Sequence, residues 1–186
     1  RASANFSQRI YALEGYLSPN TYEIYTSATP EEIIKKLLSQ TEAVFRDEWH
    51  DRADALGMTM DQVITLASLI EKEAKQADFA RVSAVFHNRL KINMALGSDV
   101  TIKYVTGTER MSLNNSDLSV DSPYNTYRNK GLPPGPICNP SAAAIEAALY
   151  PDETFTAQNY LYFCSKDPAT GELYFSRTLE EHEAAV

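Results

Sequence analysis

The chain has 186 residues, of which 44% are hydrophobic and 10% aromatic, and this is enough for one domain with a closed core. Its formal net charge of -8 argues against a nucleic-acid binder, because such proteins present clustered Lys and Arg to the phosphate backbone. No stretch approaches the roughly 18 apolar residues of a membrane span, and no secretion signal opens the chain. We therefore expect one globular domain over residues 1–186, with any anchor or export signal upstream of it.

The histidines and cysteines give no sign of metal or redox chemistry. His50, His87 and His182 stand apart from one another, and no Cys-x-x-Cys or His-Glu-x-x-His motif accompanies them. Cys138 and Cys164 are far apart in sequence, a pattern more typical of two separate thiols than of a disulfide. We therefore expect no metal and no cofactor.

The first half of the chain predicts an opening segment followed by a helix. Residues 11–25 are aromatic-rich and contain a Ser-Pro-Asn turn, so residues 1–28 are expected to form an extended segment folded onto the domain. Thr29 and Glu32 form a capping box around a proline, which predicts the beginning of a helix. Apolar residues at helical spacing extend this helix to about Leu56.

Two further helices are expected around a pair of glutamates. Thr59 and Gln62 offer a second capping box, and the helix that they open carries Glu71 and Glu73. Asp78 can cap a third helix with apolar residues on one face. The two helices therefore meet near the glutamates.

The second half of the chain has less regular patterning. Residues 93–121 predict short strands and turns, and residues 122–136 predict a loop stiffened by four prolines. Asn139 and the proline after it are expected to cap an Ala-rich helix that ends before Pro151.

The chain is expected to end in a hairpin and a helical turn. Residues 160–165 and 172–176 are rich in aromatic residues and flank a short turn, which predicts an antiparallel hairpin. Thr178 and Glu181 can cap a final helical turn. The predicted fold class is α+β, a helical core with short antiparallel strands and a Pro-rich loop.

Both glutamates border the apolar side of their predicted helix, which consists of Val63, Leu66, Ala67, Ile70, Ala74 and Ala77. A carboxyl among apolar neighbours loses hydration when it ionises, so its pKa rises and it can hold a proton near neutral pH. The ordinary alternative is that each side chain reaches water or pairs with a cation such as Lys75. Glu71 and Glu73 point about 160° apart, so they do not form the carboxylate pair of most glycosidases. Helical periodicity does not choose between them.

The run ASLIEKEA at residues 67–74 is one of several segments that match a known family. Together with these segments it resembles the endolytic transglycosylases called MltG or YceG-like proteins, and the resemblance covers nearly the whole chain in order. The most specific strings are YNTY and GLPPGPI. The other matching segments are EGYLSPNTY (14–22), VSAVFHNRL (82–90), NMALGSDVTIKY (93–104), SPYNTYRNKGLPPGPICNP (122–140), and residues 160–163 and 175–182.

The resemblance implies endolytic cleavage of nascent peptidoglycan strands between N-acetylmuramic acid and N-acetylglucosamine, leaving a 1,6-anhydro end. The second glutamate of Glu-Lys-Glu is the catalytic one in the family, which corresponds to Glu73, used as lysozyme uses a helical glutamate. Glu71 is then a supporting carboxylate and the alternative catalytic residue. One glutamate suffices, because it can protonate the leaving oxygen and then accept the proton of the sugar's own 6-hydroxyl.

The resemblance also implies a cellular setting. A single-pass anchor upstream would hold the catalytic domain on the extracytoplasmic side of the cell membrane. Peptidoglycan strands would be the substrate, and glycan polymerases or penicillin-binding proteins would be partners. No nucleic-acid partner is expected.

Two segments are expected to bind the sugar. The first is GSDVT at residues 97–101, where many relatives resemble QTDPT. The second is the loop with YNTY, whose rings, amide and hydroxyl suit sugar faces and edges and whose prolines limit the ordering cost. The substrate-binding candidates are Ser98, Asp99, Tyr124, Asn125, Thr126 and Tyr127.

Residues at the end of the third predicted helix and in the hairpin are expected to be structural. Asn88 and Arg89 favour a cap or an internal salt bridge over substrate contact. Phe163 and Phe175 favour the core.

Two other functions fit the sequence. A lysozyme-like muramidase would use a second carboxylate, with Asp99 as the candidate, to activate water. A non-catalytic glycan-binding scaffold is suggested by the altered loop at residues 97–100.

Overall fold

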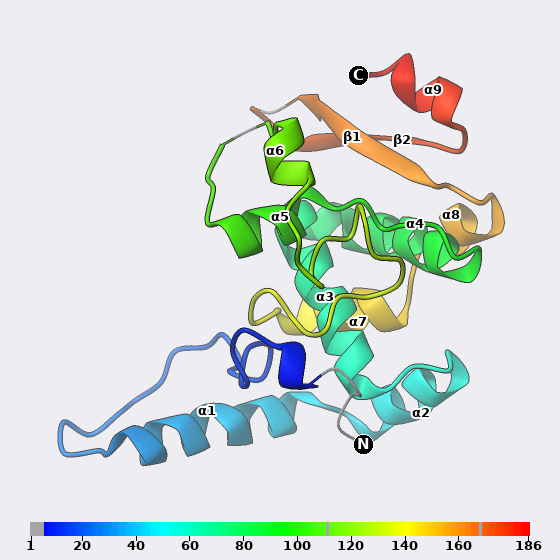
Figure 1. Cartoon of the computed structure of the whole chain (residues 1–186). Helices are drawn as coiled ribbons and strands as arrows, with labels where there is room; N and C mark the ends of the chain where they lie inside the picture. Colours follow the sequence, from blue (N-terminus) through cyan, green and yellow to red (C-terminus); the bar gives the residue numbers. More distant parts are fainter. Residues whose placement is uncertain (1–5, 111, 168) are drawn as a thin grey trace.

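The computed structural model describes residues 6–110, 112–167 and 169–186. Helices surround a central helix, and a two-stranded antiparallel hairpin covers one end of the molecule (Figure 1), so the predicted α+β class is confirmed. None of the helices in these three ranges is long and apolar enough to cross a membrane. The elements are η1 (Phe6–Gln8), α1 (Pro30–Val44), α2 (Asp47–Ala55), α3 (Met60–Glu73), η2 (Gln76–Asp78), α4 (Phe79–Lys91), α5 (Asp99–Thr106), α6 (Asn115–Leu118), α7 (Ala142–Leu149), α8 (Glu153–Ala157), β1 (Tyr162–Asp167), β2 (Glu172–Ser176) and α9 (Leu179–Glu183).

Helix α3 is the centre of the core. Residues 63–70 are buried without interruption, as expected for a helix enclosed by its neighbours. Its two buried hydroxyls are bonded: Thr65 donates to a carbonyl oxygen within α3, and Ser68 also accepts the backbone N–H of Ile137. The predicted apolar side was therefore too narrow, because every residue from 63 to 70 is buried and not one side alone. It was also too long, because it extended beyond the end of the helix. The helix ends at Glu73, and Ala77 lies exposed in η2.

The first predicted helix is divided in two. The capping box at Thr29 is confirmed, but α1 ends at Val44 because Phe45 adopts extended backbone angles, with φ -76° and ψ 117°. The resulting turn lets α2 bury Trp49 in the core, while α1 projects from the body (Figure 1). The opening segment runs beside α1, where Thr41 donates to the carbonyl oxygen of Tyr16 at 2.5 Å.

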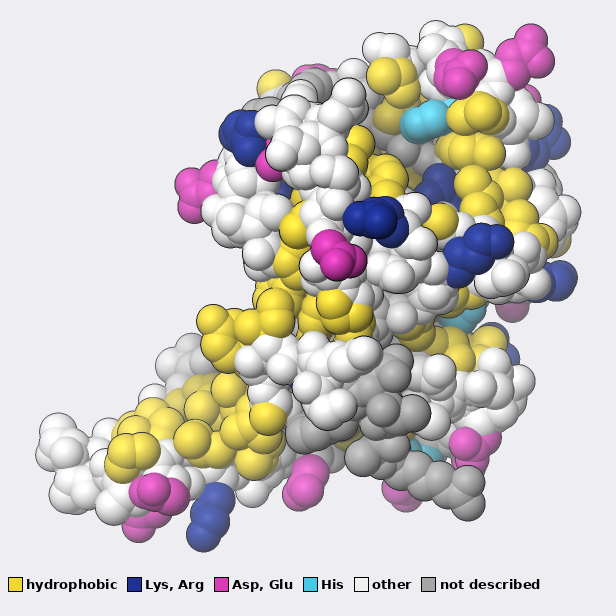
Figure 2. Space-filling view, in the orientation of Figure 1, with side chains coloured by type: hydrophobic (Ala, Val, Ile, Leu, Met, Phe, Trp, Pro, Cys, Tyr) yellow, Lys and Arg dark blue, Asp and Glu magenta, His cyan; other side chains and the backbone are white. Residues whose placement is uncertain are grey.

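The projecting α1 keeps an apolar surface. Ile34 on the helix and Ile24 and Tyr25 on the opening segment are exposed, and Figure 2 shows apolar side chains gathered along this arm. The described part of the opening segment, residues 6–28, is irregular apart from η1.

The prediction of strands within residues 93–121 was wrong. In the residues of this range that the structure describes, the regular elements are the helices α5 and α6. Helix α5 contains several β-branched residues, but Thr101 and Ile102 are completely buried, and burial outweighs the small helix propensity difference. Gly107 ends α5 with a left-handed φ of 66°.

Capping predictions had mixed outcomes. The capping boxes at Thr59 and Thr178 are confirmed, as is the hairpin, in which Phe163 pairs with Phe175. Both rings pack against the core, as expected. Asp78 precedes α4 but forms no side-chain cap, because its carboxylate pairs with Arg81 at 3.0 Å.

The predicted cap of α7 was also misplaced. Ser141 caps the helix by accepting the N–H of Ala144. Asn139 instead accepts the backbone N–H groups of Gly15 at 2.8 Å and Leu17 at 3.1 Å. It therefore ties the opening segment to the Pro-rich loop. Gly15 has φ +87°, and a Cβ there would lie 2.4 Å from Pro136, so this close approach requires glycine.

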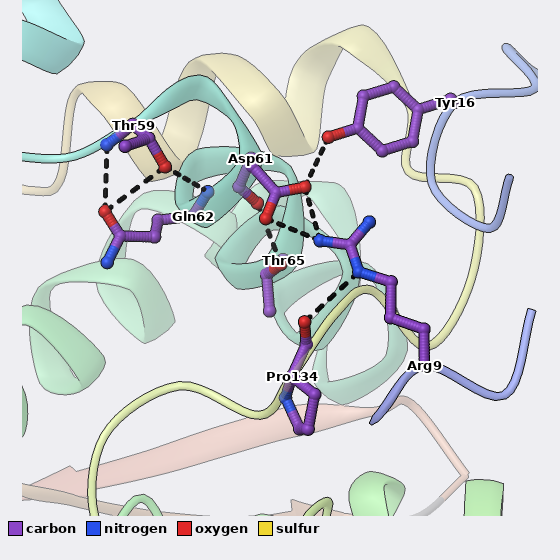
Figure 3. Close-up of polar contacts among 7 residues, drawn as sticks. All are labelled: Arg9, Tyr16, Thr59, Asp61, Gln62, Thr65 and Pro134. Carbon is purple, nitrogen blue, oxygen red and sulfur yellow. Dashed lines mark hydrogen bonds and ion pairs between the residues drawn. The ribbon is translucent and has the colours of Figure 1, made fainter. Parts of the chain in front are cut away.

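A buried ion pair joins the opening segment to the beginning of α3 (Figure 3). Arg9 binds the carboxylate of Asp61, and their side chains are only 2% and 12% exposed. Tyr16 donates its hydroxyl to the same carboxylate, and Arg9 Nε donates to the carbonyl oxygen of Pro134 at 3.2 Å. Three segments far apart in sequence are therefore joined through Arg9, which contacts both Asp61 and Pro134.

We predict that Asp61→Asn lowers the free energy of unfolding by about 3 kcal/mol, because it removes the carboxylate charge from a buried ion pair. Denaturant unfolding of the chain measures the change. Asp51→Asn, an exposed position on α2, is the matched control and should change stability by less than about 0.5 kcal/mol. Equal unfolding midpoints for the two variants would contradict the role given to the ion pair.

Candidate active site

A cleft of about 600 Å³ opens beside the end of α3. One wall is the hairpin, and the others are the end of α4, the segment before α5 and the last helix. The lining residues are Glu73, Arg89, Met94, Ala95, Leu96, Gly97, Asp99, Tyr127, Tyr162, Phe163, Cys164, Ser165, Leu173, Leu179, His182 and Val186. Of the two glutamates, only Glu73 lines this cleft.

Glu73 is half-buried as the last residue of α3. Burial raises the pKa of its carboxyl from an ordinary 4.5 to about 7, and repulsion from Asp99 acts in the same direction. The hydrogen bond from Ser98 and the positive charges of Lys103 and Arg89 lower this pKa, but burial dominates. The negative end of the helix dipole also disfavours a carboxylate at this position. Glu73 can therefore exchange a proton near neutral pH.

Ser98 and Asp99 connect Glu73 to the Pro-rich loop. The Ser98 hydroxyl donates to Glu73 Oε1, and the Ser98 backbone N–H donates to the Thr126 hydroxyl at 2.9 Å. Asp99 begins α5 and accepts a hydrogen bond from the hydroxyl of Tyr127, which is 41% exposed. The structure thus brings together Glu73, Ser98, Asp99 and Tyr127.

The other three predicted binding residues lie in the interior. Tyr124, Asn125 and Thr126 are each at most 1% exposed. Tyr124 packs against the ring of Tyr104 at 5.2 Å, and the Asn125 amide donates to two carbonyl oxygens of the chain before it. The hydrogen bonds of Asn125 and Thr126 hold the loop in shape.

Glu71 faces the opposite way from Glu73, in agreement with the helical wheel. Its carboxylate accepts the backbone N–H of Ser141 at 3.0 Å and the Ser141 hydroxyl at 2.6 Å. These bonds hold the beginning of α7, where a negative charge is favourable. The two glutamates of one motif therefore face separate parts of the fold.

Arg89 was expected to form an internal salt bridge or a cap, and its internal contacts are hydrogen bonds to carbonyl oxygens. No carboxylate of the described residues lies within ion-pair distance of it. Arg89 donates to the carbonyl oxygens of Leu161 and Leu96, each at 2.6 Å, and its guanidinium lies 5.2 Å from the ring centre of Tyr162. The expectation of an internal contact holds for Asn88, which is buried and donates to two carbonyl oxygens.

Sequence reasoning missed the cleft positions of Arg89, Tyr162 and His182. Tyr162 stacks on His182 with ring centres 5.3 Å apart, and both lie far along the chain from Arg89. Their only sequence signal was that all three fall within or beside segments that resemble the family.

The cleft offers carboxyl, hydroxyl and aromatic groups. In the part of the chain that the structure describes, no three His, Cys, Asp or Glu side chains could hold a metal ion. Cys138 and Cys164 are free thiols. A carboxyl with a raised pKa in a cleft, as Glu73 is, has the properties of an acid–base group.

Comparisons with known proteins agree with the sequence resemblance. The chain is 42% identical over 177 residues to an endolytic murein transglycosylase of Bacillus subtilis (strain 168), covering 94% of this chain and 47% of that protein. It is 37% identical over 182 residues to an endolytic murein transglycosylase of Streptococcus pneumoniae serotype 2 (strain D39 / NCTC 7466), covering 95% of this chain and 32% of that protein. This chain therefore spans about half or less of these relatives.

A solved structure and a family model extend the comparison to the fold. The crystal structure of a YceG-like protein from Listeria monocytogenes superposes with a TM-score of 0.87 and 39% sequence identity, over 98% of this chain and 59% of that one. The model of the YceG-like family matches residues 2–186. The match spans the helix that carries Glu73, the Pro-rich loop and the hairpin, and the chain therefore belongs to the YceG-like family.

Proposed function

We propose that residues 1–186 form the catalytic domain of an endolytic peptidoglycan lytic transglycosylase, with Glu73 as its acid and base. The observation that carries the proposal is a half-buried carboxyl with a pKa of about 7 in an open cleft. The relatives named endolytic murein transglycosylases support the substrate and the reaction class.

The proposed reaction needs one proton-transferring group. Glu73 donates its proton to the oxygen that links N-acetylmuramic acid to N-acetylglucosamine while the bond from the muramyl C1 to that oxygen breaks. The 6-hydroxyl oxygen of the same muramyl sugar then bonds to C1, and its proton passes to the Glu73 carboxylate. The acid is regenerated, no water is consumed, and the product carries a 1,6-anhydro end.

The neighbours of Glu73 support both halves of this cycle. Ser98 donates a hydrogen bond to the carboxylate form, and the negative charge of Asp99 favours the protonated form. These opposing effects suit a group that must give and then recover a proton. Tyr127, held by Asp99 and exposed at the cleft, is positioned to contact a sugar face.

The cellular setting is proposed from the family resemblance. An upstream single-pass anchor would hold the domain on the extracytoplasmic side of the cell membrane. Glycan polymerases or penicillin-binding proteins would be its partners in the cell-wall machinery.

We predict that digestion of uncrosslinked glycan strands yields 1,6-anhydro ends, and mass spectrometry of the products measures this. Products with reducing ends, one water heavier, would instead favour the muramidase. In that case Asp99, the second carboxyl group of the cleft, would be the group that activates water. Asp99→Asn would then abolish cleavage, whereas the lyase needs no second carboxylate.

We predict that Glu73→Gln lowers kcat by roughly 10²- to 10⁴-fold, because an amide cannot transfer the proton. Gln keeps an oxygen that can accept the Ser98 hydrogen bond, so the fold should be retained. Single-turnover assays on defined glycan oligomers measure the loss.

The matched control for this substitution is Glu71→Gln, two residues away on the same helix. It should leave kcat within a few-fold and lower stability by about 1 kcal/mol, because it weakens the contacts at the beginning of α7. A large loss of kcat in Glu71→Gln and a small one in Glu73→Gln would instead identify Glu71 as the catalytic residue. Glycan binding without cleavage by the unmodified chain would favour the scaffold.

We predict that kcat/KM falls tenfold per pH unit above about pH 7, because only protonated Glu73 can begin the reaction. The carboxyl has a raised pKa, so the active form predominates below that pH and is lost above it. Asp99→Asn removes a negative charge that raises this pKa and should move the midpoint to lower pH. A wild-type midpoint near 4.5 would contradict the assigned environment of Glu73.

A further inference from the structure

Arg89 is a cation on the cleft wall that has no counter-ion among the described residues. Its Nε and Nη1 atoms donate to the carbonyl oxygens of Leu161 and Leu96, which fixes the plane of the guanidinium. Its Nη2 atom has no partner in the part of the chain that the structure describes. The side chain therefore presents a free pair of N–H groups at a surface that lines the cleft.

The electrostatics of Arg89 favour an anionic ligand. The side chain is half-buried, and burial lowers its pKa, because a charge removed from water without a counter-ion is costly. Glu73 is the carboxylate whose charge acts on Arg89. Since Glu73 must be protonated to begin the proposed reaction, it cannot neutralise Arg89 at that stage.

A second unpartnered group lies at the same end of the cleft. The Nδ1 atom of His182 is buried and has no hydrogen-bond partner among the described residues. His182 stacks on Tyr162, and the Arg89 guanidinium lies over that same ring. Burial and the nearby Arg89 lower the pKa of His182, so both favour its neutral form.

The segment before α5 leaves room beside Arg89. Gly97 lines the cleft with φ +53°, and a Cβ there would lie 3.4 Å from Arg89 Nη1 and 3.6 Å from the Tyr127 ring. The absence of a side chain at this position keeps the space between the guanidinium and the tyrosine open to a ligand.

We propose that Arg89, with His182 beside it, is a subsite for a carboxylate carried by the muramyl unit of the substrate. This inference rests on the proposed function. The glycan backbone is otherwise neutral, so its negative charges come from two sources. They are the lactyl carboxylate of a muramyl sugar that lacks a stem peptide, and the carboxylates of the stem peptide itself. Both are carried by the muramyl sugar whose bond from C1 Glu73 would cut.

The test measures binding in the Glu73→Gln background, where the strand is not cut. Four probes are compared: stem-free oligomers with free lactyl carboxylates, the same oligomers with these groups converted to methyl amides, stem-bearing oligomers, and neutral chito-oligosaccharide. Adding Arg89→Gln should weaken binding of the carboxylate-bearing probes by roughly 10- to 100-fold, the usual effect of losing a hydrogen bond to a charged group. Binding of the two neutral probes should be unchanged.

The probes also distinguish the two sources. A loss confined to the stem-free oligomers with free carboxylates assigns the subsite to the lactyl group. A loss confined to the stem-bearing oligomers assigns it to the peptide. Equal weakening of charged and neutral probes, or no weakening of any, overturns the proposal, because Arg89 would then act only through its bonds to the hairpin and the segment before α5.

Controls separate charge recognition from structure. Arg46→Gln is the same substitution on an exposed arginine before α2 and should leave binding of every probe unchanged. Arg89→Lys keeps the charge and should restore part of the affinity. If neither Arg89 variant folds, the salt dependence of binding to the Glu73→Gln protein is measured instead. Added NaCl should weaken binding of the charged probes and leave binding of the neutral probes unchanged. The same salt response for charged and neutral probes would overturn the proposal.

The binding readout is independent of the proposed activity. If the unmodified chain cuts no strand but charged probes bind through Arg89, the proposed function fails and the subsite stands. If strands are cut and Arg89→Gln does not discriminate between probes, the subsite fails and the activity stands.

Discussion

The enclosure of α3 is the constraint on which the site depends. Eight successive buried residues, 63–70, fix the helix on all sides, so it can neither rotate nor slide without exposing apolar surface at about 25 cal/mol per Å². Polar contacts then fix both ends. Asp61 binds Arg9 near the beginning, and Glu71 holds α7 near the end. Glu73 is the last residue of this fixed helix, so it has little freedom to move out of the cleft.

The same enclosure gives Glu73 its chemistry. Apolar residues that stabilise the core also remove water from the carboxyl, and this loss of hydration is the main cause of its raised pKa. A carboxyl in a wholly apolar setting would resist ionisation too strongly to donate its proton. The Ser98 hydroxyl counters part of that effect, and Ser98 is in turn held by Thr126 of the Pro-rich loop. Thr126, a buried residue of this loop, therefore acts on the Glu73 carboxyl through Ser98.

Structural features that depend on a few residues close together in the chain could be predicted from the sequence. The capping boxes at Thr29, Thr59 and Thr178 depend on side chains three positions apart, and all three are present. Features decided by distant contacts could not. Helix α5 forms against its β-branched composition because Thr101 and Ile102 are buried. For the site, wheel geometry separated the two glutamates, but it could not assign Ser98 or Ser141 as their partners.

The interior position of the YNTY residues has the same physical origin. Rings and amides suit sugars and protein interiors equally well, so residue type alone does not distinguish a binding loop from a folded one. Burial of Tyr124 and Asn125 leaves Tyr127 as the ring of this string that lines the cleft. Arg89 shows the converse case. Arg89 donates to Leu161, 72 positions away. Only the fold shows that it lines the same cleft as Glu73.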